Sequence, residues 1–338
     1  MRMLRVIAAG LACVATAAIG QGVPEKKDVH IAVGGKSALY YLPLTIAEQL
    51  GYFKDEGLEV KISDFAGGSQ ALRAVVGGSA DVVAGAYEHT INMQAQKQML
   101  VAFVQMGRLP QISVGIAKAK AASYKSPKDL RGLKVGVSAP GSSTNILFNY
   151  FISRDGLKPN DVAIVGVGLG AGAVAAIKSG EIDAISNTDP VMTKLEQDDA
   201  VKIIADWRTV AGTERTFGGQ LPAGSLYAPI KFVKENPSTV QALTNAIVRA
   251  DKWVANARAT DVAKVVPESY LLGDRALYLF AYDKVKEAFS KDGMFTDAGA
   301  KATLEVLASY NEKIKPQEIR LGETYTNEFV KKANAKYK

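Results

Sequence analysis

Short β-branched runs alternate with amphipathic helical patterns from residue 28 onward. Strands are predicted at residues 28–33, 58–65, 80–85 and 99–106. Between them, residues 42–53 and 67–78 repeat apolar side chains at helical spacing, with Pro43 near one start and Gly51 near one end. This βαβα rhythm predicts a mostly parallel sheet covered by helices.

The same alternation repeats after residue 126. Strands are predicted at residues 133–138, 161–167, 181–187 and 200–207, with helices at 141–156 and 171–180. The pattern then becomes purely helical, at residues 238–257, 276–289 and 296–310. Two α/β units of about 100 residues each imply two lobes with a cleft between them. The late helices are expected to pack back on the first lobe.

The N-terminus has a different character. A basic head is followed by the uncharged, apolar stretch 6–20, and Ala15-Thr16-Ala17 fits a signal-peptidase pattern. This predicts a secretory signal peptide over residues 1–20, cleaved near residues 17–20. Cys13 is the only cysteine, and Gly10 stands where a lipoprotein signal has an apolar residue. A soluble exported protein is therefore favoured over a lipoprotein, and the mature chain would carry no thiol.

Composition narrows the function classes. The 338 residues are 48% hydrophobic and 22% charged, as in ordinary globular proteins. The net charge of +7 is not gathered into basic stripes with interleaved aromatic residues, which argues against a nucleic-acid partner. Beyond the predicted signal peptide there is no apolar run of about 18 residues, so the mature protein is not expected to be embedded in a membrane.

The turn Gly34-Gly35-Lys36-Ser37 looks like the end of a phosphate-binding loop. Such a loop needs a glycine five positions before Gly35, and His30 stands there. Tyr40 and Tyr41 follow where a helix should begin. The sequence therefore predicts a glycine-rich turn rather than a nucleotide site, and it leaves open whether Lys36 faces a ligand or solvent.

Four predicted loops leave the carboxyl ends of strands, where ligands bind in open α/β sheets. They are residues 34–41, 66–70, 85–90 and 138–145. Two of them place Ser69, Ser142 and Ser143 at helix starts, where free N–H groups and the helix dipole attract anions. The same serines could be ordinary N-caps, and the two roles are compatible.

Chemistry-bearing residues are sparse. Tyr40, Tyr41 and Tyr87 could line a pocket or simply pack. Of the two histidines, only His89 is a plausible base, and whether it faces the cleft stays open. No metal-ligand set, nucleophile triad or complete dinucleotide fingerprint occurs, so we expect no metal site, no cofactor, no catalytic residues and no enzymatic activity. Asn187 and Asp189 follow a predicted strand and could meet a ligand donor or form a turn.

Residues 42–85 and 126–168, with their order and spacing, resemble the periplasmic substrate-binding proteins for aliphatic sulfonates, taurine and nitrate. The resemblance extends over roughly residues 29–260. It implies an α/β, type II periplasmic binding fold with residues 28–112 plus 223–338 in lobe 1, 113–222 in lobe 2, and hinge strands at 112–117 and 224–230. It also implies a monomeric periplasmic receptor that delivers a small molecule to an ABC permease.

The resemblance further implies which residues line the cleft: Ser37, Tyr40, Gly68, Ser69, Tyr87, Glu88, Ser142, Ser143, Thr144, Asn187 and Asp189. Thiamine-pyrimidine synthases that share the fold carry a cysteine-rich iron motif, which the mature chain lacks. Thr188 and Asp189 stand where many relatives have a tryptophan before the proline. A small anionic ligand such as a sulfonate, a taurine-like molecule or nitrate is expected, and an aromatic carboxylate, a thiamine-precursor pyrimidine or a related enzyme stays open.

Overall fold

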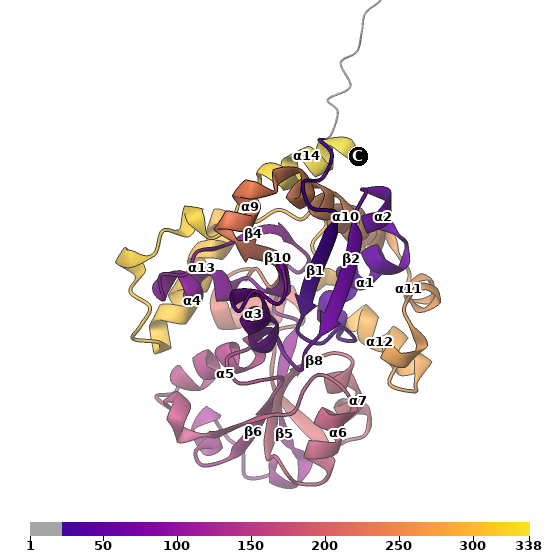
Figure 1. Cartoon of the computed structure of the whole chain (residues 1–338). Coiled ribbons are helices and arrows are strands. Elements are labelled where there is room, and N and C mark those ends of the chain that lie inside the picture. The colour runs from indigo at the N-terminus through magenta and orange to yellow at the C-terminus, as the bar shows by residue number, and fades with distance from the viewer. Residues whose placement is uncertain (1–21) are drawn as a thin grey trace, which may run out of the picture.

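Two five-stranded sheets organise the computed structural model, which describes residues 22–338 (Figure 1). The predicted signal peptide lies outside the described residues. The first sheet has the order β2-β1-β3-β10-β4. Its strands are β1 (Asp28–Val33), β2 (Glu59–Asp64), β3 (Val82–Ala86), β4 (Leu100–Gln105) and β10 (Gly224–Pro229).

The second sheet has the order β7-β6-β8-β5-β9. Its strands are β5 (Ile112–Ala117), β6 (Lys134–Val137), β7 (Ala163–Gly166), β8 (Ala184–Thr188) and β9 (Val201–Asp206). In each sheet one strand runs against its neighbours, β10 in the first and β5 in the second, and the other pairs are parallel. The expected α/β class with two sheets is confirmed.

Helices follow most strands, as the alternating pattern predicts. The first lobe has the 3-10 turn η1 (Leu39–Tyr41) and helices α1 (Leu42–Gln49), α2 (Tyr52–Asp55), α3 (Gly68–Val76) and α4 (Glu88–Ala95). The second has α5 (Ser143–Ser153), α6 (Ala171–Lys178), α7 (Val191–Gln197) and α8 (Val210–Phe217). Gly51, at φ 74°, separates α1 from α2 because a glycine reaches the left-handed region at little cost.

The C-terminal part is helical, with α9 (Ile230–Glu235), α10 (Pro237–Asn256), α11 (Ala259–Val265), α12 (Arg275–Val285), α13 (Asp297–Tyr310) and α14 (Glu328–Lys336). Helix α10 packs on α1, α2 and α14, so this segment covers the first lobe as expected. Two helices also reach the second lobe, because α12 contacts α7 and α13 contacts α5. The C-terminal segment therefore packs against both lobes.

The chain passes between the lobes twice, at residues 106–111 and 218–223. The two crossings are bonded to each other: the N–H groups of Met106 and Gly107 donate to the Gly224 carbonyl at 2.7 and 3.0 Å, and Ala223 N–H donates to Gly107 O at 2.9 Å. The segments 112–117 and 224–230, expected as hinge strands, belong to the sheets as β5 and β10. The crossings directly precede them.

The apolar core is continuous across the lobes. One cluster of buried side chains joins Tyr87 and Phe295 of the first lobe to Val114, Phe148 and Trp207 of the second. Apolar packing as well as the two crossings therefore joins the lobes. None of the helices between residues 22 and 338 is long and apolar enough to cross a membrane.

Candidate functional site

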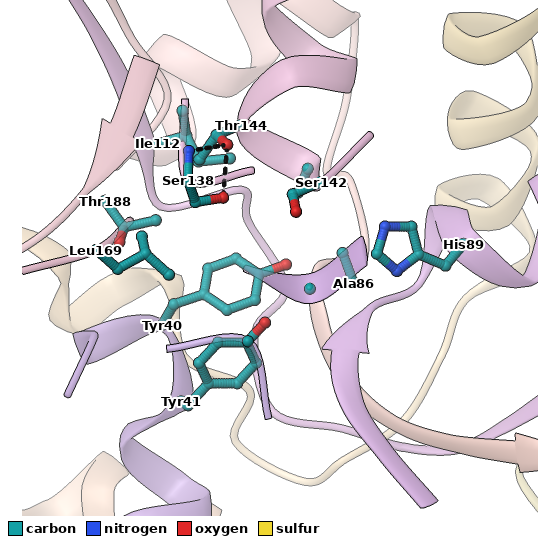
Figure 2. Close-up of a pocket in the computed structure, with 13 residues that line it drawn as sticks. Tyr40, Tyr41, Ala86, His89, Ile112, Ser138, Ser142, Thr144, Leu169 and Thr188 are labelled. Atoms are coloured by element: carbon teal, nitrogen blue, oxygen red, sulfur yellow. Dashed lines mark hydrogen bonds between the residues drawn. The ribbon is translucent and has the colours of Figure 1, made fainter. Parts of the chain in front are cut away.

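The two lobes meet around a small cavity of about 20 Å³, which has room for about one water molecule. Figure 2 shows its wall. Both lobes contribute side chains to it, from η1, α3, β3 and α4 on one side and from β5, α5 and β8 on the other. The lining residues are Gly34, Tyr40, Tyr41, Gly68, Ala86, His89, Ile112, Ser138, Ser142, Ser143, Thr144, Leu169 and Thr188.

A second, wider hollow of about 320 Å³ lies on the surface of the first lobe, near residues 94–99 and 313–320. Only first-lobe residues line it. The smaller cavity is the better candidate site because carboxyl-end loops of both sheets converge on it, as they do in ligand-binding open sheets.

The first turns of α3 and α5 face each other across the cleft. Ser142 Oγ accepts a hydrogen bond from Ser69 N–H at 3.0 Å and lies 3.1 Å from Ser69 Oγ, which donates to the Pro140 carbonyl at 2.9 Å. Neither serine caps its own helix through its side chain. Two positive helix ends therefore point at the same small volume. The Ser142 hydroxyl donates to Ser69 Oγ and the Ser69 hydroxyl to Pro140 O, so an anion could use these donors only once the lobes separate.

Aromatic rings form one wall. Tyr40 and Tyr41 pack edge to face with ring centroids 4.9 Å apart, and both hydroxyl groups point toward the cavity (Figure 2). The Tyr40 hydroxyl is buried and has no hydrogen-bond partner among residues 22–338. Burial and the neighbouring Glu88 raise its pKa, so it stays a neutral donor. The Thr188 hydroxyl, on the opposite side, is also buried and has no partner within the described part of the chain.

His89 connects the lobes from the first turn of α4. Its Nε2 lies 3.3 Å from the Gly141 carbonyl, which can only accept, so Nε2 carries the proton. Its Nδ1 therefore accepts from the Tyr227 hydroxyl at 2.7 Å. Burial lowers the pKa of His89 to about 4, and the ring is neutral at neutral pH. His89 thus serves as a neutral cross-lobe donor.

Glu88 precedes His89 and is 3% exposed. Its Oε1 has no hydrogen-bond partner in the described part of the chain. Burial raises the pKa of Glu88 to about 7, and the nearby Ser143 hydroxyl opposes the shift. A carboxyl group that is neither paired with a cation nor fully bonded is costly in a protein interior, which makes Glu88 the most unusual side chain near the cavity.

Asp189 lies behind the cavity at the end of β8. Its carbonyl accepts from Leu39 N–H of the first lobe at 3.0 Å, and its carboxylate contacts the buried guanidinium of Arg208 at 3.3 Å. Arg208 also bonds Glu196 at 2.8 Å and Asp206 at 2.6 Å. Burial opposes the charge of Arg208, but the three carboxylates outweigh it and raise its pKa. Asp189 is thus engaged by structural partners.

Five of the residues expected from sequence line the cavity: Tyr40, Gly68, Ser142, Ser143 and Thr144. Ser69 and Glu88 lie beside it. Ser37 is half-buried in the opening loop and is not part of the wall. Whether any of these residues contacts a ligand stays a prediction.

Two other expected residues, Tyr87 and Asn187, have different surroundings. Tyr87 points into the core, where its hydroxyl bonds Thr324 Oγ1 at 2.6 Å and its ring packs on Phe295. Asn187 is buried and donates to the Gly168 carbonyl at 3.0 Å. Lys36, left open by the sequence, pairs with Glu48 at 2.7 Å. Among residues 22–338, no Lys or Arg lines the cavity.

Sequence reasoning missed several lining residues, among them Leu169, Ile112 and Thr188. Leu169 lies between Gly168 and Gly170, and its side chain covers the opening loop, because a Cβ on Gly35 would meet it. Thr188 follows a strand and could have been found by the same rule that selected Asn187. Within residues 22–338, no group of three or more His, Cys, Asp or Glu is placed to hold a metal ion.

The fold has clear counterparts among solved structures. A structure of a protein from Bordetella bronchiseptica RB50 has a TM-score of 0.92 and 55% identity, covering 93% of this chain and 99% of that one. The alkanesulfonate-binding protein SsuA of Xanthomonas axonopodis pv. citri, solved with MOPS, has a TM-score of 0.68 and 18% identity over 90% of this chain and 99% of its own. The nitrate-binding protein NrtA of Synechocystis PCC 6803 has a TM-score of 0.69 and 13% identity over 94% and 90%. The last two show the periplasmic binding fold alone.

Curated relatives are more distant. YtlA of Bacillus subtilis (strain 168), named only as a binding protein, is 22% identical over 236 residues, 69% of this chain and 68% of that protein. A 4-amino-5-hydroxymethyl-2-methylpyrimidine phosphate synthase of Schizosaccharomyces pombe is 28% identical over 144 residues, 43% of this chain and 40% of that enzyme. The sequence profile of the family described as NMT1/THI5 like matches residues 38–259.

Proposed function

Because the chain belongs to the NMT1/THI5-like family, we propose that it is an exported receptor that captures one small molecule between its lobes and delivers it to the permease of an ABC importer. The likeness in fold to importer binding proteins supports this proposal. The signal peptide expected at residues 1–20, the periplasmic location and the permease belong to the same proposal.

The observation that carries the proposal is the convergence of both lobes on one cavity. Hydroxyl groups and the first turns of α3 and α5 reach it from opposite sides, and the Ser69–Ser142 and His89–Gly141 hydrogen bonds close it. A receptor needs this arrangement, since each lobe supplies half of the binding groups and closure completes the site.

The small size of the cavity implies that the lobes open before a ligand binds. About 20 Å³ cannot hold a sulfonate or a carboxylate with its carbon skeleton, so the lobes must separate before such a ligand binds. The bonded crossings at residues 106–111 and 218–223 are the places where the backbone can bend. Closure around a ligand would then replace the cross-lobe hydrogen bonds with bonds to the ligand.

The groups that line the cavity favour an anionic ligand that no Lys or Arg side chain of residues 22–338 contacts. Lys36 is committed to Glu48, and the lining offers hydroxyl groups, main-chain N–H groups and two helix ends. Helix ends attract anions and need no charged side chain. We therefore propose an organic ligand with a sulfonate or carboxylate group, with nitrate as the smallest member of the series.

A second candidate ligand class is favoured by the wall of the cavity. Tyr40 and Tyr41 present two rings to the cavity, and rings stack on flat ligands. An aromatic carboxylate or a thiamine-precursor pyrimidine would use them. A related enzyme is the remaining alternative, because the synthase relatives share part of the sequence.

The test is a thermal-shift screen of the purified mature chain, followed by titration calorimetry of each hit. The panel contains alkanesulfonates, taurine, nitrate, aromatic carboxylates and pyrimidines. At 100 times its dissociation constant a true ligand stabilises the protein by about 2.7 kcal/mol. We expect a dissociation constant near 1 μM, equivalent to about −8 kcal/mol. A panel without any shift would overturn the receptor assignment, and bound iron with turnover of pyridoxal phosphate would establish the enzyme instead.

A further inference from the structure

The carboxyl group of Glu88 is buried beside the candidate site. Glu88 is the first residue of α4 and lies between Ala86 and His89, both of which line the cavity. It is close enough to Tyr40 and Tyr41 to raise their pKa values, and the Ser143 hydroxyl of the second lobe acts on its own pKa. Glu88 is therefore a buried carboxyl group next to side chains that line the cavity, with Oε1 unbonded among residues 22–338.

This carboxyl group lacks the partners that buried acids normally have. None of the ion pairs formed by residues 22–338 includes Glu88, and its Oε1 accepts no hydrogen bond there. The titratable groups around it are Tyr40, Tyr41, Tyr227 and Tyr310, and the adjacent His89 is neutral. No cation offsets the charge that Glu88 carries once it ionises.

The position is unfavourable for a ligand that is only an anion. An ionised Glu88 would repel a sulfonate or nitrate held in the neighbouring cavity, because charges interact strongly where water is excluded. Such a ligand would have to bind together with a proton. A ligand that also carries an N–H donor would instead satisfy Oε1 and offset the cost of burying the carboxyl group.

From this geometry we infer that Glu88 accepts a hydrogen bond from an amino or amidine N–H group of the ligand, while the first turns of α3 and α5 hold its anionic group. The receptor then selects small molecules that carry both groups over those that carry the anion alone. Glu88 is a specificity-determining residue in this scheme. The inference rests on the proposed receptor function.

The experiment compares matched pairs that differ by the amino group. The pairs are taurine with ethanesulfonate, β-alanine with propionate, and 4-aminobenzoate with benzoate, titrated at pH 8 into the full mature chain. Wild type should bind the amino member of at least one pair at least tenfold more tightly. Glu88→Gln keeps the shape of the side chain but removes its charge, and should reduce that ratio to threefold or less. Glu305→Gln is the matched control, because it makes the same replacement at an exposed position on α13. It should leave the ratio unchanged.

The outcomes separate the two proposals. Equal affinities within every pair that binds, or a ratio that Glu88→Gln does not change, would overturn the role of Glu88 and leave the receptor function standing. Absence of binding by all six compounds would overturn the inference, whereas the receptor proposal falls only if the wider thermal-shift panel also gives no ligand. Thermal unfolding curves of Glu88→Gln without any added compound establish that the variant is folded.

Discussion

Ser142 Oγ accepts a hydrogen bond from the main-chain N–H of Ser69 at 3.0 Å, so the first turn of α3 is completed by a hydroxyl from the other lobe. In an ordinary N-cap the hydroxyl bonds within its own helix. Here Ser142 opens α5 without doing so. A ligand anion at this place would compete with Ser142 for the same N–H group, which couples binding to the contact between the lobes.

Replacing both serines tests this coupling. We expect Ser69→Ala combined with Ser142→Ala to weaken an anionic ligand at least tenfold, about 1.4 kcal/mol. Titration calorimetry of both single variants and the double variant gives a double-mutant cycle, in which the two effects should not add because the side chains touch. Ser79→Ala, an exposed serine at the end of α3, is the control. Unchanged affinity in the double variant would show that these serines act only in closure.

Much of the architecture could be predicted from the sequence because it rests on local patterns. The strand predicted at 28–33 matches β1, and the helix predicted at 296–310 matches α13 within one residue. Helix α4 could not be predicted in this way, because Glu88, His89 and Thr90 in its first turn carry no apolar helical stripe and are buried by tertiary contacts.

The site was less predictable for the same reason. Loop position selected Tyr40, Gly68 and Ser142, which line the cavity because the carboxyl ends of parallel strands meet at one edge; their contact with a ligand stays a prediction. The direction of a side chain depends on packing across the lobes. Tyr87 follows a strand as Ser138 does, yet its ring turns into the core toward Phe295.

Glu88 should make stability fall as the pH rises. The folded-state pKa of Glu88 is about 7 and its ordinary value is 4.5, so between these values the folded chain holds a proton that the unfolded chain has released. By linkage, the stabilisation present below pH 4.5 is lost as the pH rises through 7. At about 1.4 kcal/mol per pKa unit the loss is on the order of 3 kcal/mol.

Glu88→Gln removes this titration. Its free energy of unfolding, measured by urea denaturation without added ligand, should exceed that of wild type at pH 8 by more than it does at pH 4.5. The pKa of His89 is lowered to about 4, which destabilises the fold as the pH falls below 6.5, but this effect is common to both proteins and cancels in their difference. A difference that does not change with pH would contradict burial of an ionisable Glu88.

Arg208 should be essential to the second lobe. It is 2% exposed and contacts Asp189, which is 1% exposed, together with Glu196 and Asp206. Arg208→Met leaves the Asp189 carboxylate buried without its cation, which typically costs about 3–5 kcal/mol. Arg131→Met removes an exposed guanidinium from Asp161 and should cost at most about 1 kcal/mol. Similar losses in the two variants, measured by urea denaturation, would contradict this account.

Lys284 should favour the closed arrangement. Its Nζ on α12 contacts Glu196 of α7 at 2.7 Å and so joins the C-terminal helices to the second lobe. Both side chains are partly exposed, so the pair is worth up to about 1 kcal/mol and should weaken with salt. In Lys284→Met we expect a larger radius of gyration by small-angle X-ray scattering at low salt. Lys301→Met, whose partner lies within α13, should not change it.

The glycine-rich turn should matter through its backbone rather than through a phosphate. A Cβ on Gly34 would lie 2.2 Å from the main-chain nitrogen of Gly68, so a side chain here pushes the first turn of α3 away from the opening loop. Overpacking against backbone typically costs about 1–3 kcal/mol. Gly34→Ala should therefore lower the melting temperature and weaken ligand binding together, because the displaced turn is the one that Ser142 contacts. A Cβ on Gly219 would meet no atom of residues 22–338 within 4 Å, so Gly219→Ala should change neither quantity. Normal binding by a destabilised Gly34→Ala would mean that the start of α3 contributes to the fold and not to the site.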